Sequence, residues 1–347
     1  GNGIDPLEVI AQYGADALRF MLVDGSTPGN DMRYIEKKVE AARNFANKLW
    51  NATRFVLMNL PEDFQPGLPE ESKLDMSDKW VLTKLNQVAG AMSDNLDHYE
   101  MGLAAAKINS FIWDVYCDWF IEIAKPRLNS GDAEQADTAR RVLVYVLDKA
   151  LKLLHPFMPF ITETIWQALP HEGPSVMVSA WPEYKDELHF AAEEAQMESL
   201  MDAVRAIRNR RAEMNVPPSK KAKVLILTEK KDTFSAGAGF FPKLAYASEI
   251  ELIDAVPADA AKMASVVTGD AQIYMPMGDL IDFEAERARL GKEKSKVEAD
   301  IDFVMKKLNN PKFVDKAPEK VVAAEREKAE KLREHLAKLE ESIAALN

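Results

Sequence analysis

The sequence predicts a mostly α protein with a helical bundle, a small α+β module and a C-terminal antiparallel coiled-coil hairpin. Three observations lead to this prediction. Between residues 37 and 170, long stretches without Gly or Pro carry apolar residues at helical spacing. Between residues 224 and 275, short apolar runs are separated by turn formers. Residues 280–347 contain two heptad-patterned segments on either side of a proline-containing break.

Length and composition bound the organisation of the chain. With 347 residues it is long enough for two or three domains, and we expect divisions at 1–36, 37–190, 191–279 and 280–347. A single cysteine excludes an internal disulfide framework, and five scattered histidines give no zinc spacing, so no metal site is expected. The absence of a long apolar run and of a signal peptide favours a cytoplasmic protein with no membrane contact.

The net charge of −12 is unevenly distributed. Residues 1–190 hold 18 basic and 28 acidic side chains, whereas residues 280–347 hold 15 of each. A polyanionic partner would therefore need local basic patches, because the field of the whole molecule repels it. Non-specific DNA binding is not expected.

The bundle is predicted from helix starts and stops. The opening Gly-Asn-Gly reads as the interior of a longer protein, and Asp5-Pro6 begins a short helix that Gly14 ends. A long helix follows at 39–60, then a Pro-rich linker, and further helices at 77–97, 101–125 and 133–154. Cys117 is expected in the core, and His155 is expected to be a hydrogen-bonded corner residue where two prolines force a turn.

The helix at 39–60 carries an unusual second face. Ala42, Leu49 and Val56 lie on its apolar side, and five residues lie opposite: Asn44, Asn47, Lys48, Asn51 and Phe55. One interpretation is that Phe55 covers a neighbouring helix while the amides are solvated. The other is that amides, a cation and a ring form a surface for unstacked RNA bases.

The densest basic patch lies at the end of a predicted helix over 191–214 and just beyond it. We select as candidate phosphate-binding residues Arg205, Arg208, Arg211, Lys220 and Lys221. The alternative is a solvated helix end whose cations complement the helix dipole.

The α+β module is predicted from four short apolar runs. Val224–Leu227 and Ile250–Ile253 are strand candidates, with a helix at about 240–247 between them. Residues 265–268 and 271–275 flank Gly269-Asp270, which predicts a hairpin.

The last segment predicts two paired helices. Its heptad core positions include Val297, Val304, Val322 and Ala329, with Arg287, Lys294 and Glu325 as polar exceptions. Two helices of about 40 Å joined by a short tip pair antiparallel. The tip is basic, and its candidate contacts are Lys306, Lys312, Phe313 and Lys316. An oligomerisation coiled coil is the alternative, although pairing within the chain already occupies the seam.

Several motifs closely resemble valyl-tRNA synthetases. They include Gly14-Ala-Asp-Ala-Leu-Arg-Phe20, Pro28-Gly-Asn-Asp-Met-Arg33, Ala42-Arg-Asn-Phe-Ala-Asn-Lys48, Cys117-Asp-Trp-Phe-Ile-Glu122 and His155-Pro-Phe-Met-Pro-Phe160. The stretch from Leu308 to Pro318 is similar to the family's C-terminal arm. The family's HIGH-type and KMSKS-type motifs and its editing domain have no counterpart in this sequence, so the resemblance concerns the C-terminal part of the family alone.

The resemblance implies a class Ia anticodon-binding bundle, a junction module and an arm that touches the tRNA elbow. It implies that valine tRNA is the partner and that the face with Asn44, Asn47, Lys48, Asn51 and Phe55 reads the anticodon. ATP and Mg would belong to the full enzyme, while this fragment would hold no cofactor, catalyse nothing by itself and be a monomer. The competing hypothesis is a helical scaffold that binds protein and no RNA.

Overall fold

A computed structural model describes residues 3–26, 29, 34–280, 283–310 and 319–345. Within residues 283–290, 319–321, 338–339 and 341–345 it describes the backbone but not the side chains. None of the helices in these ranges combines the length and the apolar character needed to cross a membrane.

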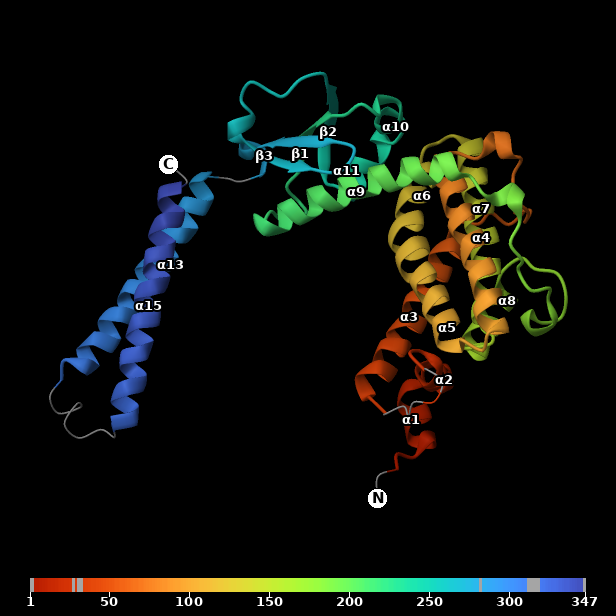
Figure 1. Cartoon of the computed structure of the whole chain (residues 1–347), viewed down its shortest axis with the longest axis horizontal. Coiled ribbons are helices and arrows are strands. Elements are labelled where there is room, and N and C mark those ends of the chain that lie inside the picture. Colours follow the sequence, from red (N-terminus) through yellow and green to blue (C-terminus); the bar gives the residue numbers. More distant parts are fainter. Residues whose placement is uncertain (1–2, 27–28, 30–33, 281–282, 311–318, 346–347) are drawn as a thin grey trace. The chain divides into compact units, whose positions relative to one another are not determined.

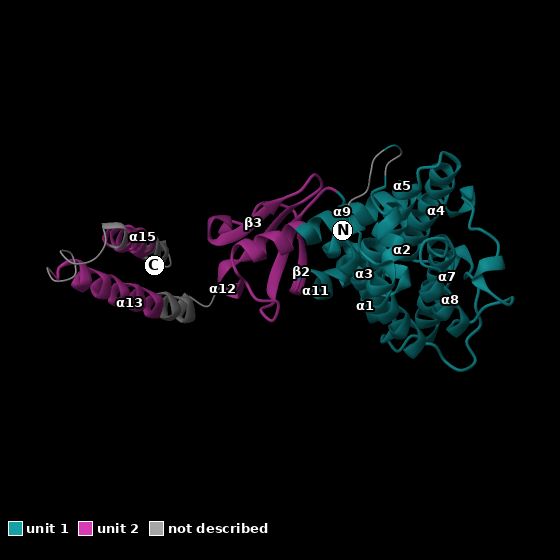
Figure 2. Ribbon diagram, turned by 90° about the horizontal axis from the view of Figure 1, so that it is seen from below, with its two compact units in different colours: residues 1–205, 230–245 teal, residues 206–229, 246–347 magenta. Residues whose placement is uncertain are grey.

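The chain forms two compact units, which Figure 2 shows in different colours. The first unit comprises residues 1–205 and 230–245, and the second comprises residues 206–229 and 246–347. This division differs from the four expected segments, because residues 1–36 and 230–245 both group with the helical bundle.

Most helices of the first unit begin where the sequence predicts. They are α1 (Pro6–Tyr13), α2 (Ala15–Val23), α3 (Glu36–Met58), α4 (Met76–Asp97), α5 (Met101–Ser110), α6 (Ile121–Leu128), α7 (Ala133–Leu154), α8 (Pro159–Ala168) and the first part of α9 (Ala191–Glu213) (Figure 1). The side chains of Asp5, Asp75 and Asp132 accept hydrogen bonds from the first turns of α1, α4 and α7. The helices pack around large buried side chains such as Trp80, Tyr116 and Trp166.

The predicted helix over 101–125 is wrong in one respect. Between α5 and α6 the chain forms a π-helix, η2 (Phe111–Phe120), and α6 then continues past Pro126 to Leu128. Pro126 has no N–H to donate to the carbonyl of Glu122, so α6 lacks that hydrogen bond and ends two residues later. A π-helix places residues five apart on one face, and this changes which side chains of this segment lie together.

Two of the sequence motifs meet in this unit. The carboxylate of Asp16 accepts hydrogen bonds from the backbone amides of Phe160 (3.2 Å) and Ile161 (2.7 Å), in the first turn of α8. Arg19 donates to the carbonyl of Pro156 at 3.1 Å. A carboxylate is favoured at a helix N-terminus, so α2 fixes the turn that precedes α8.

The second unit contains a four-stranded sheet of order β2-β1-β4-β3. Its strands are β1 (Ala222–Leu227), β2 (Ala247–Ile253), β3 (Met263–Val267) and β4 (Gln272–Pro276), followed by the short helix α12 (Met277–Leu280). Strands β1 and β2 are parallel, and β4 is antiparallel to both β1 and β3. The predicted hairpin is confirmed, while β2 begins at Ala247, inside the predicted helix.

The connection between β1 and β2 leaves the sheet. It contains α10 (Lys231–Ala236) and α11 (Phe241–Leu244), both in the first unit. Phe234 and Phe241 are fully buried, and Gly237 lies against Leu200 of α9 so closely that a Cβ there would be 2.3 Å from a Leu200 methyl carbon.

The predicted coiled-coil hairpin is confirmed as the pair α13 (Phe283–Leu308) and α15 (Glu319–Ala345). Val297, Val304, Val322 and Ala329 are buried. Two of the three polar exceptions in the heptads form ion pairs across the seam, Lys294 with Glu340 (2.8 Å) and Glu325 with Lys307 (3.0 Å). The side chain of the third, Arg287, lies outside the described residues. These pairs run in opposite directions along the two helices, as an antiparallel arrangement requires.

Candidate nucleic-acid interface

Helix α3 presents an outward row of carboxamides. Its buried side includes Leu49 and Val56, and Asn44, Asn47 and Asn51 are exposed. Among the residues that the structure describes, none of these three amides has a hydrogen-bond partner. Each amide can donate and accept, so the row can bond base edges without first breaking an internal contact.

Lys48 lies in the middle of this row but is already engaged. Its ammonium group is 2.6 Å from a carboxylate oxygen of Asp118 and 3.7 Å from the ring centre of Trp113. Its side chain is 21% exposed. Trp113 and Asp118 are five residues apart in η2, so the π-helix turns both toward Lys48. A phosphate at Lys48 would have to compete with this carboxylate.

Phe55 is half-buried at the C-terminal end of the row. The ammonium group of Lys125 lies 5.3 Å from its ring centre, and the same group is 2.5 Å from Glu122. The ring is therefore neither sealed in the core nor fully exposed. One part of the ring surface packs against the protein and the other part is accessible. This is compatible both with stacking on a base and with covering a neighbouring helix.

Two further side chains belong to this face, and the sequence analysis missed both. Trp50 is 43% exposed, and Arg54 is exposed with no ion-pair partner among the described residues. Their signal was available in the sequence, because Trp50 follows Asn47 by three positions and precedes Arg54 by four, which is the spacing of neighbours on a helix.

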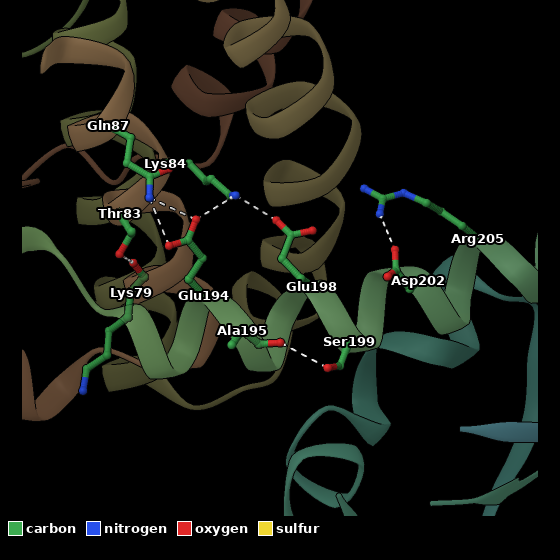
Figure 3. Close-up of polar contacts among 10 residues, drawn as sticks. All are labelled: Lys79, Thr83, Lys84, Gln87, Glu194, Ala195, Glu198, Ser199, Asp202 and Arg205. Atoms are coloured by element: carbon green, nitrogen blue, oxygen red, sulfur yellow. Dashed lines mark hydrogen bonds and ion pairs between the residues drawn. The ribbon is translucent and has the colours of Figure 1, made fainter. Parts of the chain in front are cut away.

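The candidate phosphate-binding residues are divided between the two units. Arg205 lies in the first unit, is exposed and is 2.9 Å from Asp202 (Figure 3). Its guanidinium group also lies 5.3 Å from the ring centre of Trp119. Arg208 is half-buried, Lys220 is half-buried and Lys221 is exposed, all in the second unit.

Arg211 has a different role from the predicted phosphate contact. It is 3% exposed, and its guanidinium group donates to the carbonyls of Pro217 (3.1 Å) and Lys220. It also lies 5.3 Å from the ring centre of Tyr246. These contacts close the turn between α9 and β1, and a buried side chain with this role is unable to reach a phosphate.

The beginning of α9 is fixed to α4 by lysines and glutamates. Lys84 lies 2.8 Å from both Glu194 and Glu198, and Gln87 donates to Glu194 at 3.0 Å (Figure 3). Burial opposes the charge on Lys84, but the two glutamates outweigh it and raise the pKa of that lysine. This network orients the helix that carries Arg205.

On the arm, Lys306 is exposed near the end of α13. Lys312, Phe313 and Lys316 lie outside the described residues, so their predicted roles stay predictions. The sequence analysis missed Phe303, which is 59% exposed and has the ammonium group of Lys307 at 4.8 Å from its ring centre.

The titratable core residues have structural partners. Burial raises the pKa of the Cys117 thiol to about 12, so its expected place in the core is confirmed. His155 is confirmed as a corner residue, with Nδ1 at 2.7 Å from the hydroxyl of Thr162.

Arg127 forms two hydrogen bonds with the buried carboxylate of Asp78, at 2.7 and 2.8 Å. Within the described ranges, no His, Cys, Asp and Glu side chains are grouped so that they could hold a metal ion.

Comparison with known families assigns a class to both units. Residues 78–226 match the family described as the anticodon-binding domain of tRNA ligase, and residues 282–347 match the valyl tRNA synthetase tRNA binding arm. Residues 78–226 and 282–347 therefore have the fold of the tRNA-recognising part of an aminoacyl-tRNA synthetase, and α3 lies before the first matched range.

Individual relatives make the assignment specific. The chain is 49% identical to the valine–tRNA ligase of Clostridium acetobutylicum over 348 aligned positions, which is all of this chain and 40% of the relative. The corresponding protein of Clostridium perfringens is 47% identical, with the same coverage. The chain belongs to the valine–tRNA ligase family. It corresponds to the C-terminal portion and spans about 40% of the length of these relatives.

Proposed function

We propose that this chain binds valine tRNA, with the exposed face of α3 on the anticodon loop, and thereby positions the tRNA for ATP-dependent aminoacylation by the rest of the ligase. The observation that carries the proposal is the row of exposed amides Asn44, Asn47 and Asn51, which have no partner in the part of the chain that the structure describes, beside the open surfaces of Trp50 and Phe55. Edge hydrogen bonds combined with aromatic surface are what sequence-specific recognition of single-stranded RNA loops requires.

The charge distribution is compatible with this function. RNA binding needs cations at the contact surface, and Arg54 on α3 has no competing carboxylate among the described residues. We therefore assign the phosphate contact of this face to Arg54 and assign Lys48 to the support of Trp113. The phosphate contact predicted for Lys48 is thus transferred to a residue six positions, or about 1.7 turns, further along the helix.

The remaining cations extend the footprint. Arg205, Arg208, Lys220 and Lys221 are the proposed phosphate contacts outside the anticodon, and Lys306, Lys312, Phe313 and Lys316 are the proposed contacts of the arm with the tRNA elbow. ATP and Mg would be bound by the remainder of the ligase, which also would carry catalysis and editing. We further propose a cytoplasmic monomer that does not bind DNA or membranes.

A gel-shift titration with a valine tRNA transcript tests the proposal. We expect binding that weakens steeply as the salt concentration rises. The double variant Asn51→Ala with Phe55→Ala should bind about tenfold or more weakly, since a stacked base is worth about 1–3 kcal/mol. The matched control Gln65→Ala with Tyr99→Ala removes an exposed amide and an exposed ring elsewhere in the same unit and should bind like the parent.

The test also separates the proposal from a protein-binding scaffold. A scaffold would show no salt-dependent tRNA binding. Equal affinities of the α3 variant and its control would leave tRNA binding intact but remove the anticodon assignment.

A further inference from the structure

A recess opens between α2, α3 and the α5–η2 segment. It has a volume of about 350 Å³, within the range of about 300–1,000 Å³ usual for small-ligand sites. Its floor consists of the rings of Phe20, Phe45 and Trp113. Its rim carries four polar side chains, Asp24, Lys38, Asn44 and Asn109.

The floor is rigid. The ring centres of Phe20 and Phe45 are 5.5 Å apart, and those of Phe45 and Trp113 are 6.5 Å apart. Both phenylalanines are fully buried, so their rings, which are tilted by 41° against each other, give Trp113 a fixed support and have little exposed surface of their own. The ammonium group of Lys48 lies over one face of Trp113, 3.7 Å from the ring centre, and Asp118 fixes this lysine in turn, so a ligand meets the edge or the remaining face of Trp113. A ring that is already positioned loses little conformational entropy when a ligand packs on it.

The four side chains of the rim differ in charge and in their capacity to donate and accept hydrogen bonds. Among the described residues, no side-chain hydrogen bond or ion pair is formed by Asp24, Asn44 or Asn109. The ammonium group of Lys38 lies at the C-terminal turn of α2, 3.5 Å from where a Cβ on Gly25 would be. An aromatic floor under a few convergent polar groups is the composition of a pocket for a nucleobase, which is flat and has hydrogen-bonding edges.

The rim also indicates which bases fit. A carboxylate only accepts hydrogen bonds, whereas the two amides can donate or accept. Adenine and cytosine carry an exocyclic amino group that donates, while guanine and uracil carry a carbonyl oxygen at the corresponding position. An amino group facing Asp24 gains a charge-assisted hydrogen bond, and a carbonyl oxygen there meets a negative charge.

We propose that this recess holds one unstacked adenine or cytosine of the bound tRNA, with its exocyclic amino group on Asp24 and its ring against Trp113. The inference rests on the proposed function, because it takes the ligand to be RNA. Asn44 and Asn109 bond the remaining edge of the base, and Lys38 neutralises the adjoining phosphate.

The experiment measures filter binding of valine tRNA transcripts in which each loop adenine is replaced by guanine, and each loop cytosine by uracil, one at a time. The proteins are the parent chain, Asp24→Asn and the control Asp63→Asn, which changes an exposed carboxylate of the 61–75 loop. Asp24→Asn keeps the shape of the side chain and adds a donor. Circular dichroism verifies that each variant is folded.

Replacements of bases read by α3 should weaken binding to the parent and to Asp24→Asn alike. For the base in the recess, we expect the replacement to weaken binding to the parent about tenfold or more, in line with about 1–3 kcal/mol for discrimination between bases. For Asp24→Asn this loss should disappear, because the amide can donate to the new carbonyl oxygen, and Asp63→Asn should retain it. Asn109→Ala should weaken the unmodified transcript several-fold without changing its salt dependence.

Two results would overturn the inference. In the first, the affinities of all transcripts follow the same order for Asp24→Asn as for the parent, while salt-dependent tRNA binding persists. The recess then holds no base, and the proposed function stands. If the parent binds no tRNA, the proposed function and the inference both fail.

Discussion

At the scale of single residues, the positions of Lys48 and Arg54 decide how α3 meets a polyanion. Both are cations on the same helix, but Lys48 is paired with Asp118 and packed on Trp113, whereas Arg54 is exposed. A cation that is already neutralised releases few counterions when RNA binds, so the two should contribute differently to the salt dependence.

Arg54→Ala should therefore reduce the slope of log affinity against log salt concentration by about one contact. Lys48→Ala should weaken binding through the loss of support for Trp113 and leave that slope unchanged. Affinities for valine tRNA at several salt concentrations give both slopes. The assignment fails if the Lys48 variant loses as much slope as the Arg54 variant.

His155 makes stability depend on pH. Burial, together with the charge of Arg19, lowers its pKa below the ordinary value of 6.5, against the opposing effects of Glu163 and Asp16. The folded state thus prefers the neutral ring. The contribution of His155 to stability is fully present above pH 6.5 and is lost as the pH falls through the lowered pKa.

Between about pH 7.5 and pH 5.5 we expect the parent to lose stability relative to His155→Asn, whose amide can keep the contact with Thr162 without titrating. The difference isolates His155, because the buried carboxylate of Asp78, whose pKa is raised to about 6, titrates in both proteins. Urea denaturation at the two pH values measures this difference. The attribution to His155 is refuted if parent and variant lose equal stability over this interval.

At the scale of elements, close approaches of helices depend on small residues. A Cβ on Gly102 of α5 would lie 2.6 Å from the carbonyl oxygen of Ser26 and 3.1 Å from that of Val23. Both contacts are backbone atoms at the end of α2, so a side-chain rotation gives no relief. Glycine is therefore required for α5 to pack against α2.

Gly102→Ala should destabilise the first unit by about 1–3 kcal/mol, the usual effect of overpacking. Gly291 in α13 is the matched control, because a Cβ there would meet nothing within 4 Å and alanine favours a helix by about 1 kcal/mol. Thermal unfolding followed by circular dichroism measures both. If the Gly102→Ala protein is as stable as the parent, α2 and α5 can move apart without a loss of stability, and glycine is not required at this position.

At the scale of the whole molecule, a net charge of −12 coexists with a proposed RNA-binding function. Recognition then depends on separate local surfaces, and each should act on the part of the tRNA that it contacts. The surface of α3 is assigned to the anticodon loop and the arm to the elbow.

The double variant Lys306→Ala with Lys312→Ala should weaken binding of whole valine tRNA by a similar factor whichever anticodon it carries. It should have no effect on an isolated anticodon stem-loop, whereas changes at Asn51 and Phe55 should weaken both RNAs. Parallel titrations of the two RNAs measure these effects. The division of roles is wrong if the arm variant weakens the stem-loop as much as the whole tRNA.

Patterns of local origin were predictable from the sequence. The outward amides of α3 follow from helical periodicity, and the pairing of α13 with α15 follows from heptads around a short tip. The polar heptad residues Lys294 and Glu325 are compatible with this pairing, because each forms an ion pair with a residue of the other helix.

Other features of the candidate site depend on contacts between distant segments. In the sequence, nothing distinguishes Arg211 from the other arginines at the end of α9. Its burial depends on carbonyl partners in a turn whose path is set by the sheet. The π-helix that brings Trp113 and Asp118 to Lys48 has no periodic signature of its own, because an apolar helix with ordinary or widened turns has the same composition.

The sequence by itself determined the helices, the hairpin of the sheet, the coiled-coil arm and the family, because these follow from local spacing and from motifs. Only the tertiary structure decided which cations on α3 are free, that Arg211 is buried, and that three rings and four polar side chains surround one recess. The physical reason is that a side chain's availability depends on the charges and surfaces that other segments bring beside it, and spacing along one segment does not specify them.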